Sequence, residues 1–219
     1  MARRTKEEAQ ATREGILDAA RDCFHEHGVA GASLAMIGNR AGFTRGAVYW
    51  HFKNKTEVLE ALVKRERLPF IERLRRSCSA QRTTPVLDLR SALLVTLDEL
   101  ARDDRGRQTM EIMLRNDLSA ESVAMQRIHK ENAQEQMEIY TRVFTRAREL
   151  GQLREFAEPR TMARMLHTCL TGVIYNAMIQ PELFDIRRDF QQILDVVLYA
   201  HVKEGVFTCG AEPSPLPLD

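Results

Sequence analysis

The residues best suited to chemistry in this 219-residue chain lie in the run RGAVYWHF, from Arg45 to Phe52. At about 100° per residue on a helix, Val48 and Phe52 fall on one face, whereas Tyr49 and Trp50 fall on the other, with Arg45 at its edge. Water disfavours exposed rings unless a partner covers them, and the major groove offers acceptors to Arg and methyl groups to apolar side chains. The pattern therefore predicts a helix that binds a nucleic-acid groove.

Local charge agrees with this interpretation. The chain as a whole carries a formal net charge of +1, but up to Thr56 nine Lys and Arg stand against six Asp and Glu. Between Asn39 and Thr56 no residue is acidic and four are basic, namely Arg40, Arg45, Lys53 and Lys55. A phosphate backbone is the natural counterpart of such a basic segment. Gly46 lies on the same outward face, where the missing side chain allows another backbone to approach closely.

Two short helices must position these side chains. Ser33 and Thr44 are hydroxyl residues suited to cap helices, and residues 41–43 (Ala-Gly-Phe) separate the two apolar-periodic segments that follow the caps. This arrangement is typical of a helix-turn-helix motif. The next helix begins with a capping-box-like sequence from Asn54 to Glu57, and we expect Pro69 to kink or interrupt it. An earlier helix that buries an apolar stripe should stop at Gly28.

The run TRGAVYWHFKNK resembles very closely the recognition helix and following turn of TetR-type repressors, in the branch of AcrR-like regulators of multidrug efflux pumps. The opening MARRTKEEAQATREGILDAA is similar to the same branch, and the strong resemblance covers roughly residues 1 to 65. It implies a homodimer that represses transcription by binding a palindromic double-stranded DNA operator. It further implies release by a small lipophilic effector, control of a multidrug efflux operon and a link to antibiotic resistance.

We expect a defined set of residues to contact DNA. Arg45 is the best candidate for a guanine contact, Trp50 would pack on a sugar or thymine methyl, and Gly46 would allow close approach. Phosphate, backbone or base-edge contacts are expected from Ser33, Thr44, Tyr49, His51 and Lys55. In the family a basic arm before the first helix lies in or along the minor groove, which would place Arg3 and Arg4 there. A frayed, solvated tail is the alternative for this arm.

The rest of the chain shows only helical patterns, which predicts an all-α protein of about nine helices. Pro85 suits the first turn of one helix, Thr109–Arg115 suits a shorter one, and a long helix is expected from Ser119 to Gly151. We expect three segments: a three-helix DNA-binding domain with its basic arm over residues 1–56, a helical ligand-binding and dimerisation bundle over residues 57–204, and a flexible tail over residues 205–219.

The last two apolar helices, at 159–180 and 186–203, could be core or could pair with their copies in a four-helix dimer interface. The resemblance favours the dimer. It also implies a ligand pocket in the bundle, for which the candidates are Arg67, Phe70, Met110, Met113, Tyr140, Phe144, Met165 and Cys169. Methionine suits a deformable apolar pocket, but taken without the resemblance it is more commonly a core residue, so a helix-turn-helix regulator without a small-molecule ligand is the alternative function.

Other classes find little support in the sequence. There is no phosphate-binding loop, nucleophile elbow or metal signature, so we expect no enzyme, no cofactor and no metal site. His25 and His27 are two apart and would point in different directions on a helix. The four cysteines form no CxxC pair, so reduced thiols are expected, with redox sensing by Cys78 or Cys209 as the alternative. No signal peptide or membrane span is visible, which predicts a cytoplasmic protein.

Overall fold

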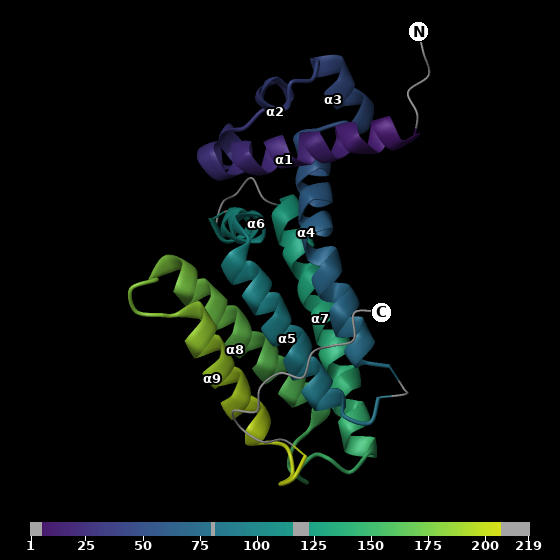
Figure 1. Ribbon diagram of the computed structural model, residues 1–219, viewed down its shortest axis with the longest axis vertical. Coiled ribbons are helices and arrows are strands. Elements are labelled where there is room, and N and C mark those ends of the chain that lie inside the picture. The colour runs from purple at the N-terminus through teal and green to yellow at the C-terminus, as the bar shows by residue number, and fades with distance from the viewer. Residues whose placement is uncertain (1–5, 80–81, 116–122, 207–219) are drawn as a thin grey trace. The chain divides into compact units, whose positions relative to one another are not determined.

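The computed structural model describes residues 6–79, 82–115 and 123–206, shown as ribbons in Figure 1. Within these ranges the chain forms nine α-helices and no β-strand, apart from an isolated bridge between Leu153 and Val202. The all-α prediction is therefore confirmed. The helices are α1 (Lys6–Gly31), α2 (Leu34–Arg40), α3 (Arg45–His51), α4 (Lys55–Ser77), α5 (Pro85–Arg102), α6 (Asp104–Arg115), α7 (Val123–Glu149), α8 (Pro159–Ile179) and α9 (Ile186–Tyr199).

Most helix ends follow from local sequence. Gly28 near the end of α1 has φ 70° and ψ 163°, a conformation that essentially only glycine adopts, and it breaks the helix where the sequence predicts. Gly151 follows α7 with φ 71°. At the start of α4, the Glu57 amide donates to Asn54 Oδ1 at 2.9 Å, and the Lys53 amide donates to Glu57 Oε2 at 2.7 Å. These reciprocal bonds make the predicted capping box.

Three helices differ from the sequence prediction or have an expected start outside the described residues. Pro69 does not interrupt α4, because the following turns are held by Ile71 and Leu74, which are buried in an apolar core. Helix α6 begins at Asp104 rather than at Thr109, with Arg107 donating to the Asp104 carboxylate at 2.6 Å one turn along. Residue 119, the expected start of the long helix, lies outside the described residues, and α7 is described from residue 123 onward.

The described residues divide into two compact units. Unit 1 lies within Met1–Arg67 and Asp104–Ile128, and unit 2 lies within Leu68–Asp103 and His129–Asp219. Helices α4 and α7 each contribute residues to both units. The segments expected from the sequence were defined by function, as DNA binding, ligand binding with dimerisation, and tail. Their boundaries differ from those of the two compact units, and the functional segments stay a prediction.

In unit 1, α1 packs against α2 and α6, and α2 packs against α3. Ile16, Leu17, Ile37, Val48 and Leu62 are fully buried in its apolar cluster. Polar contacts also join α1 to α6: Arg21 Nε donates to Gln108 Oε1 at 3.1 Å, and His25 Nε2 lies 2.7 Å from Glu111 Oε2. The helix-turn-helix therefore packs on α1 and shares unit 1 with α6 and the first half of α4.

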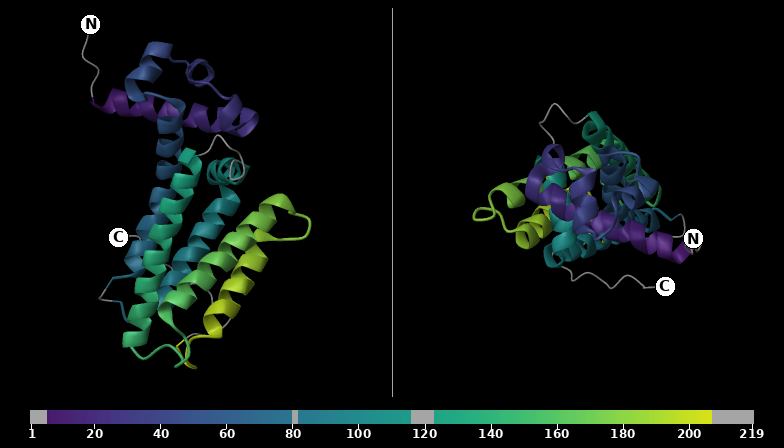
Figure 2. Two further views of the ribbon diagram at one scale, coloured as in Figure 1. Left: turned by 180° about the vertical axis from the view of Figure 1, so that it is seen from behind. Right: turned by 90° about the horizontal axis from the view of Figure 1, so that it is seen from above.

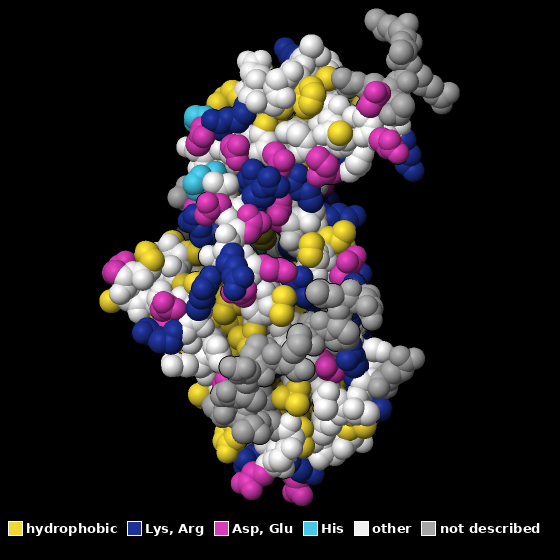
Figure 3. Space-filling model, viewed as in Figure 1, with side chains coloured by type: hydrophobic (Ala, Val, Ile, Leu, Met, Phe, Trp, Pro, Cys, Tyr) yellow, Lys and Arg dark blue, Asp and Glu magenta, His cyan; other side chains and the backbone are white. Residues whose placement is uncertain are grey.

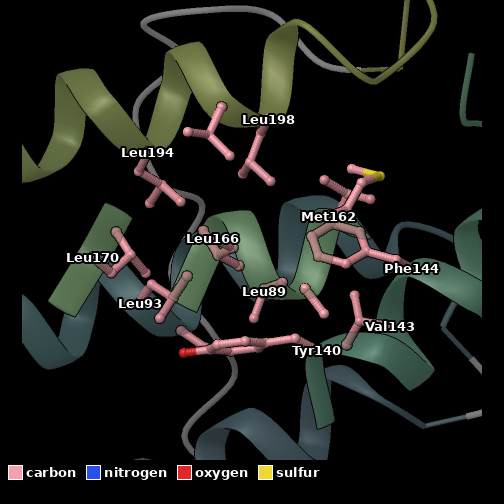
Figure 4. Packing of buried hydrophobic residues seen from close by; sticks show 14 of the residues in the cluster. Leu89, Leu93, Tyr140, Val143, Phe144, Met162, Leu166, Leu170, Leu194 and Leu198 are labelled. Carbon is pink, nitrogen blue, oxygen red and sulfur yellow. The ribbon is translucent and has the colours of Figure 1, made fainter. Parts of the chain in front are cut away.

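In unit 2, α8 and α9 lie side by side and α9 also packs against α5. Figure 2 shows the short loop that joins α8 to α9 at one end of the pair. Leucines of α5, α8 and α9 meet Tyr140, Val143 and Phe144 of α7 in the core of this unit (Figure 4). A buried ion pair crosses this core: Arg90 donates through Nε and Nη2 to the two carboxylate oxygens of Asp195, at 2.6 and 2.9 Å.

Outside these cores, charges of both signs are interspersed on the surface, as the face in Figure 3 shows. Many of them form ion pairs within one helix or between neighbours, such as Arg102 with Asp98 and Arg65 with Glu14. This distribution fits the formal net charge of +1 and means that a basic surface, where one exists, must be local.

Candidate nucleic-acid interface

The helix-turn-helix is held by two hydroxyl caps and one close helix contact. Ser33 Oγ accepts a hydrogen bond from the Met36 amide at 3.2 Å, and Thr44 Oγ1 accepts one from the Ala47 amide at 3.2 Å. In the turn between α2 and α3, Gly42 has φ 70°, which favours glycine. A Cβ on Gly38 would lie 3.1 Å from a Val48 methyl, a tight contact that would force Val48 to shift slightly, so α2 and α3 pack closely at this glycine.

Helix α3 has the two faces that the periodicity predicts. Val48 is 0% exposed and Phe52 is 3% exposed, so both rest on the core of unit 1. On the outer face Trp50 is 72% exposed and Tyr49 is 45% exposed, and Arg45 is exposed beside them. Two aromatic rings of this size on one turn of a short helix make an apolar surface that nothing in unit 1 covers.

Contacts between neighbouring side chains orient the exposed residues of α3. The Arg45 guanidinium carbon lies 5.3 Å from the centroid of the Tyr49 ring, within the range of a cation–π contact. The His51 ring packs edge-on to Trp50 with centroids 4.5 Å apart. A Cβ added to Gly46 would have only Thr44 Oγ1 near it, at 4.0 Å, so the space over Gly46 is open. The surface therefore combines one guanidinium, two rings and an unobstructed stretch of backbone.

The predicted phosphate-binding groups are partly engaged within the protein. Lys55 Nζ donates to the Ala30 and Ala32 carbonyls at 2.9 and 3.0 Å, which ties the start of α4 to the end of α1. An ammonium group has three donors, so one remains for a phosphate. The Ser33 and Thr44 hydroxyls accept from the backbone in their caps, which leaves each O–H able to donate. The capping role and a phosphate contact are thus compatible.

One of the four basic residues of this segment is neutralised locally. Arg40 Nη2 donates to both carboxylate oxygens of Glu26, at 2.7 and 2.8 Å. The Arg40 hydrogen bond holds the pKa of Glu26 below its usual value, so the carboxylate is charged at neutral pH. The basic character of the segment then rests on Arg45, Lys53 and Lys55. Arg3 and Arg4 of the expected arm lie outside the described residues.

Two supporting contacts could not be found from sequence periodicity. The Arg13 guanidinium of α1 lies 5.2 Å from the centroid of the Phe52 ring, at the end of α3. A Cβ on Gly15 would lie 3.2 Å from the Phe43 ring, so this turn residue packs directly on α1. Both contacts join residues that are far apart in the chain, and both fix the helix-turn-helix on α1.

The residues expected to line a ligand pocket fall into two groups. Tyr140 and Phe144 are buried in the apolar cluster of unit 2, and Phe70, Met165 and Cys169 pack partly buried against that cluster. These five therefore belong to one apolar cluster, and the pocket itself stays a prediction. The other three belong to unit 1: Met113 is buried in its cluster, and Met110 and Arg67 are half-buried.

His167 is a polar group that the sequence analysis did not single out, in the same helix as Met165 and Cys169. Its Nδ1 lies 3.2 Å from Gln136 Oε1 of α7, and burial lowers its pKa. A half-buried imidazole with a depressed pKa is neutral near pH 7 and can donate one hydrogen bond and accept another. No periodic signal marks such a residue, because its significance comes from the pairing of α7 with α8.

Cysteine and histidine geometry bears on the remaining alternatives. Burial raises the pKa of Cys23, which is 2% exposed, and of half-buried Cys78, whose thiol faces the Leu74 and Ile139 carbonyls at 3.5 Å. A raised pKa lowers the thiolate fraction and with it the reactivity. Position 209 lies outside the described residues. Among the residues that the structure describes, no three His, Cys, Asp or Glu side chains are grouped to hold a metal ion.

The same described residues contain no helix that is both long and apolar enough to cross a membrane.

Comparison with known proteins adds a second line of evidence. Residues 16–62 match the sequence model described as bacterial regulatory proteins of the tetR family. Residues 84–202 match the model described as the C-terminal region of MAATS-type transcriptional repressors. Together the two matches cover the helix-turn-helix and most of unit 2.

Three relatives extend over nearly the whole chain. A solved structure of SmeT, in a complex with triclosan, has a TM-score of 0.92 and 54% identity, covering 95% of this chain and 100% of that one. SmeT is described as the repressor of the Stenotrophomonas maltophilia multidrug efflux pump SmeDEF. NalD, the secondary repressor of the MexAB-OprM multidrug efflux pump in Pseudomonas aeruginosa, has a TM-score of 0.78 and 30% identity, covering 91% and 100%. The regulator TtgR of Pseudomonas putida is 33% identical over 90% of this chain and 95% of its own length.

Proposed function

The chain belongs to the TetR family of bacterial regulatory proteins, and on that premise we propose that it is a ligand-responsive repressor of a multidrug efflux operon. The observation that carries the proposal is the outer face of α3, where Arg45, Tyr49 and Trp50 are exposed above a buried Val48. The efflux role rests on likeness to SmeT and NalD, both of which are described as repressors of multidrug efflux pumps.

On DNA, two copies of α3 would enter successive major grooves of a pseudo-palindrome, about one helical turn apart. Arg45 would donate to a guanine, and Trp50 would pack on a sugar or a thymine methyl. Ser33, Thr44, Tyr49, His51 and Lys55 would contact phosphates or base edges, and Gly46 would admit the DNA backbone. Arg3 and Arg4 would add minor-groove contacts from the N-terminal arm. An operator of this kind lies on the bacterial chromosome, so the protein would act in the cytoplasm.

The two copies would pair through α8 and α9. Tyr175 and Ile179 lie one turn apart on α8 and are 44% and 53% exposed, and on α9 Val196 and Tyr199 are 67% and 46% exposed. These stripes lie on the sides of the helices opposite to the buried Leu170, Leu194 and Leu198. Large apolar side chains on two adjacent helices are best explained by burial against the same surface of a second copy.

The effector would bind in the bundle. Phe70, Tyr140, Phe144, Met165 and Cys169 lie in or against one apolar cluster, which suits a lipophilic compound, and SmeT has been solved with triclosan. Arg67, Met110 and Met113 remain candidates from the sequence. To reverse operator occupancy from 99:1 to 1:99, the effector must favour the released state by about 10⁴-fold, or about 5.5 kcal/mol per dimer. Helix α4, which contributes residues to both units, is suited to transmit that preference.

The proposal is tested with the full-length protein and the duplex found upstream of its own gene. The labelled duplex should be bound in preference to a scrambled duplex, and triclosan or a related lipophilic compound should both release it and raise the melting temperature of the free protein. Binding without release by any compound of such a panel would instead favour a helix-turn-helix regulator without a small-molecule ligand. Absence of any preference for the upstream duplex would refute the repressor function.

A further inference from the structure

Arg45 and Tyr49 form a stacked pair on the exposed face of α3. They are four residues apart, and the guanidinium carbon of Arg45 lies 5.3 Å from the centroid of the Tyr49 ring. In the part of the chain that the structure describes, Arg45 has neither a hydrogen bond nor an ion pair. All five N–H donors of its guanidinium are therefore available, while the guanidinium lies over the Tyr49 ring.

Holding that plane matters for base recognition. Bidentate donation to guanine O6 and N7 requires the guanidinium at a fixed angle, whereas a free arginine side chain samples many rotamers and loses that freedom when it binds. A side chain that is already restrained in the free protein loses less on binding. The ring of Tyr49 is the group in contact with the Arg45 guanidinium that can supply this restraint.

We propose that Tyr49 is a positioning residue for Arg45: its ring face, rather than its hydroxyl, orients the guanidinium for the base that Arg45 reads. The inference rests on the proposed DNA-binding function of α3. It differs from a direct DNA contact of Tyr49, because a phosphate contact through the hydroxyl would weaken binding to every sequence alike. A positioning role instead changes discrimination at one base pair and leaves the others unaffected.

The experiment uses the full-length protein and a set of duplexes in which each operator base pair is replaced in turn. The base pair read by Arg45 is the one at which Arg45→Ala loses the largest part, but not all, of the parent's discrimination. Discrimination at that pair is then measured by fluorescence anisotropy for Tyr49→Phe, Tyr49→Leu and the double variant Arg45→Ala/Tyr49→Leu. Tyr49→Met serves as a second ring-free variant, and melting curves establish that each protein is folded.

We expect Tyr49→Phe to discriminate as the parent does, because it keeps the ring. Tyr49→Leu and Tyr49→Met should lose about two- to fivefold of the discrimination, which corresponds to about 0.5–1 kcal/mol for an exposed cation–π contact. In the Arg45→Ala background, Tyr49→Leu should remove no further discrimination. The slope of affinity against salt concentration should be the same for Tyr49→Leu and the parent, because the tyrosine side chain is neutral and releases no counterion on binding.

Three results would overturn the inference. The first is that both ring-free variants discriminate at this base pair as well as the parent does. The second is that Tyr49→Phe loses as much discrimination as Tyr49→Leu. The third is that the double variant loses discrimination by the product of the two single fold-losses. A fourth result would also overturn it: if Arg45→Ala discriminates at every base pair as well as the parent does, Arg45 reads no base. Each of these outcomes leaves the repressor function standing if the parent prefers its operator, whereas a parent without that preference refutes the function itself.

Discussion

Substitution of Gly46 by alanine should change the stability of the protein and its affinity for the operator in opposite directions. Gly46 lies in the first turn of α3 on the exposed face, and a Cβ built there has Thr44 Oγ1 at 4.0 Å as its nearest neighbour. The free protein therefore accommodates the methyl group without a clash. Alanine is the better helix former and also restricts the unfolded chain, so the variant should be more stable by up to about 1 kcal/mol. For a chain of this length the melting temperature should rise by about 2–4 °C.

Operator binding should change in the opposite direction. If the DNA backbone approaches Gly46 as closely as we propose, the methyl group must displace it, at a cost of about 1–3 kcal/mol by analogy with overpacking in protein cores. That cost corresponds to roughly a 5- to 150-fold weaker affinity. Fluorescence anisotropy with a labelled operator duplex measures the affinity, and circular dichroism melting measures the stability of the same samples.

The matched control is Gly31→Ala. Gly31 is also helical, and its Cβ would make an ordinary 3.7 Å contact with the Cβ of His27, outside the predicted DNA surface. This control should bind the operator within about twofold of the parent, since it adds the same methyl group elsewhere. If Gly46→Ala also binds within twofold of the parent, the DNA backbone does not approach Gly46 and the proposed docking of α3 is wrong.

Three further substitutions test other parts of the account. Lys55→Ala removes two hydrogen bonds to the end of α1, so it should lower the free energy of unfolding by about 1–2 kcal/mol. It also removes the proposed phosphate contact, so the slope of operator affinity against salt concentration should fall by about one. An unchanged slope would exclude a phosphate contact. Asp195→Ala removes the carboxylate that accepts two hydrogen bonds from the buried Arg90, so denaturant unfolding should show a loss of about 3–5 kcal/mol of stability. The double variant Arg90→Met/Asp195→Leu should be near the parent in stability, and an equal loss in both variants would contradict this cost. Val196→Arg places a charge on the exposed stripe of α9 and should give a monomer by sedimentation, and a dimer of parental affinity would place the interface elsewhere.

The features that follow from short-range periodicity could be predicted from the sequence. The two faces of α3 depend only on the helical repeat, and Val48 and Trp50 are buried and exposed as that repeat requires. The caps at Ser33, Thr44 and Asn54 depend on bonds within one turn, and these too are where the sequence places them.

Features that depend on contacts between distant segments could not be predicted. Lys55 pairs with carbonyls more than twenty residues earlier, and Arg90 pairs with Asp195 across 105 residues. Helical phase reveals which side of a helix is buried but not which helix covers it. For the same reason the sequence did not show that Met113 of α6 packs in the core of unit 1, and its role in a ligand pocket stays a prediction.

The central claim is that the exposed face of α3 binds operator DNA and that a lipophilic compound governs the binding. Its most direct test is an anisotropy titration of the labelled upstream duplex with full-length parent and Arg45→Ala, each with and without an effector that stabilises the parent. We predict that the parent binds as one dimer per operator of two half-sites and that the effector releases it. Arg45→Ala should bind about 5- to 150-fold more weakly, which corresponds to a loss of about 1–3 kcal/mol of binding free energy. Equal affinity of parent and Arg45→Ala for the upstream duplex, with both proteins folded and dimeric, would contradict the claim.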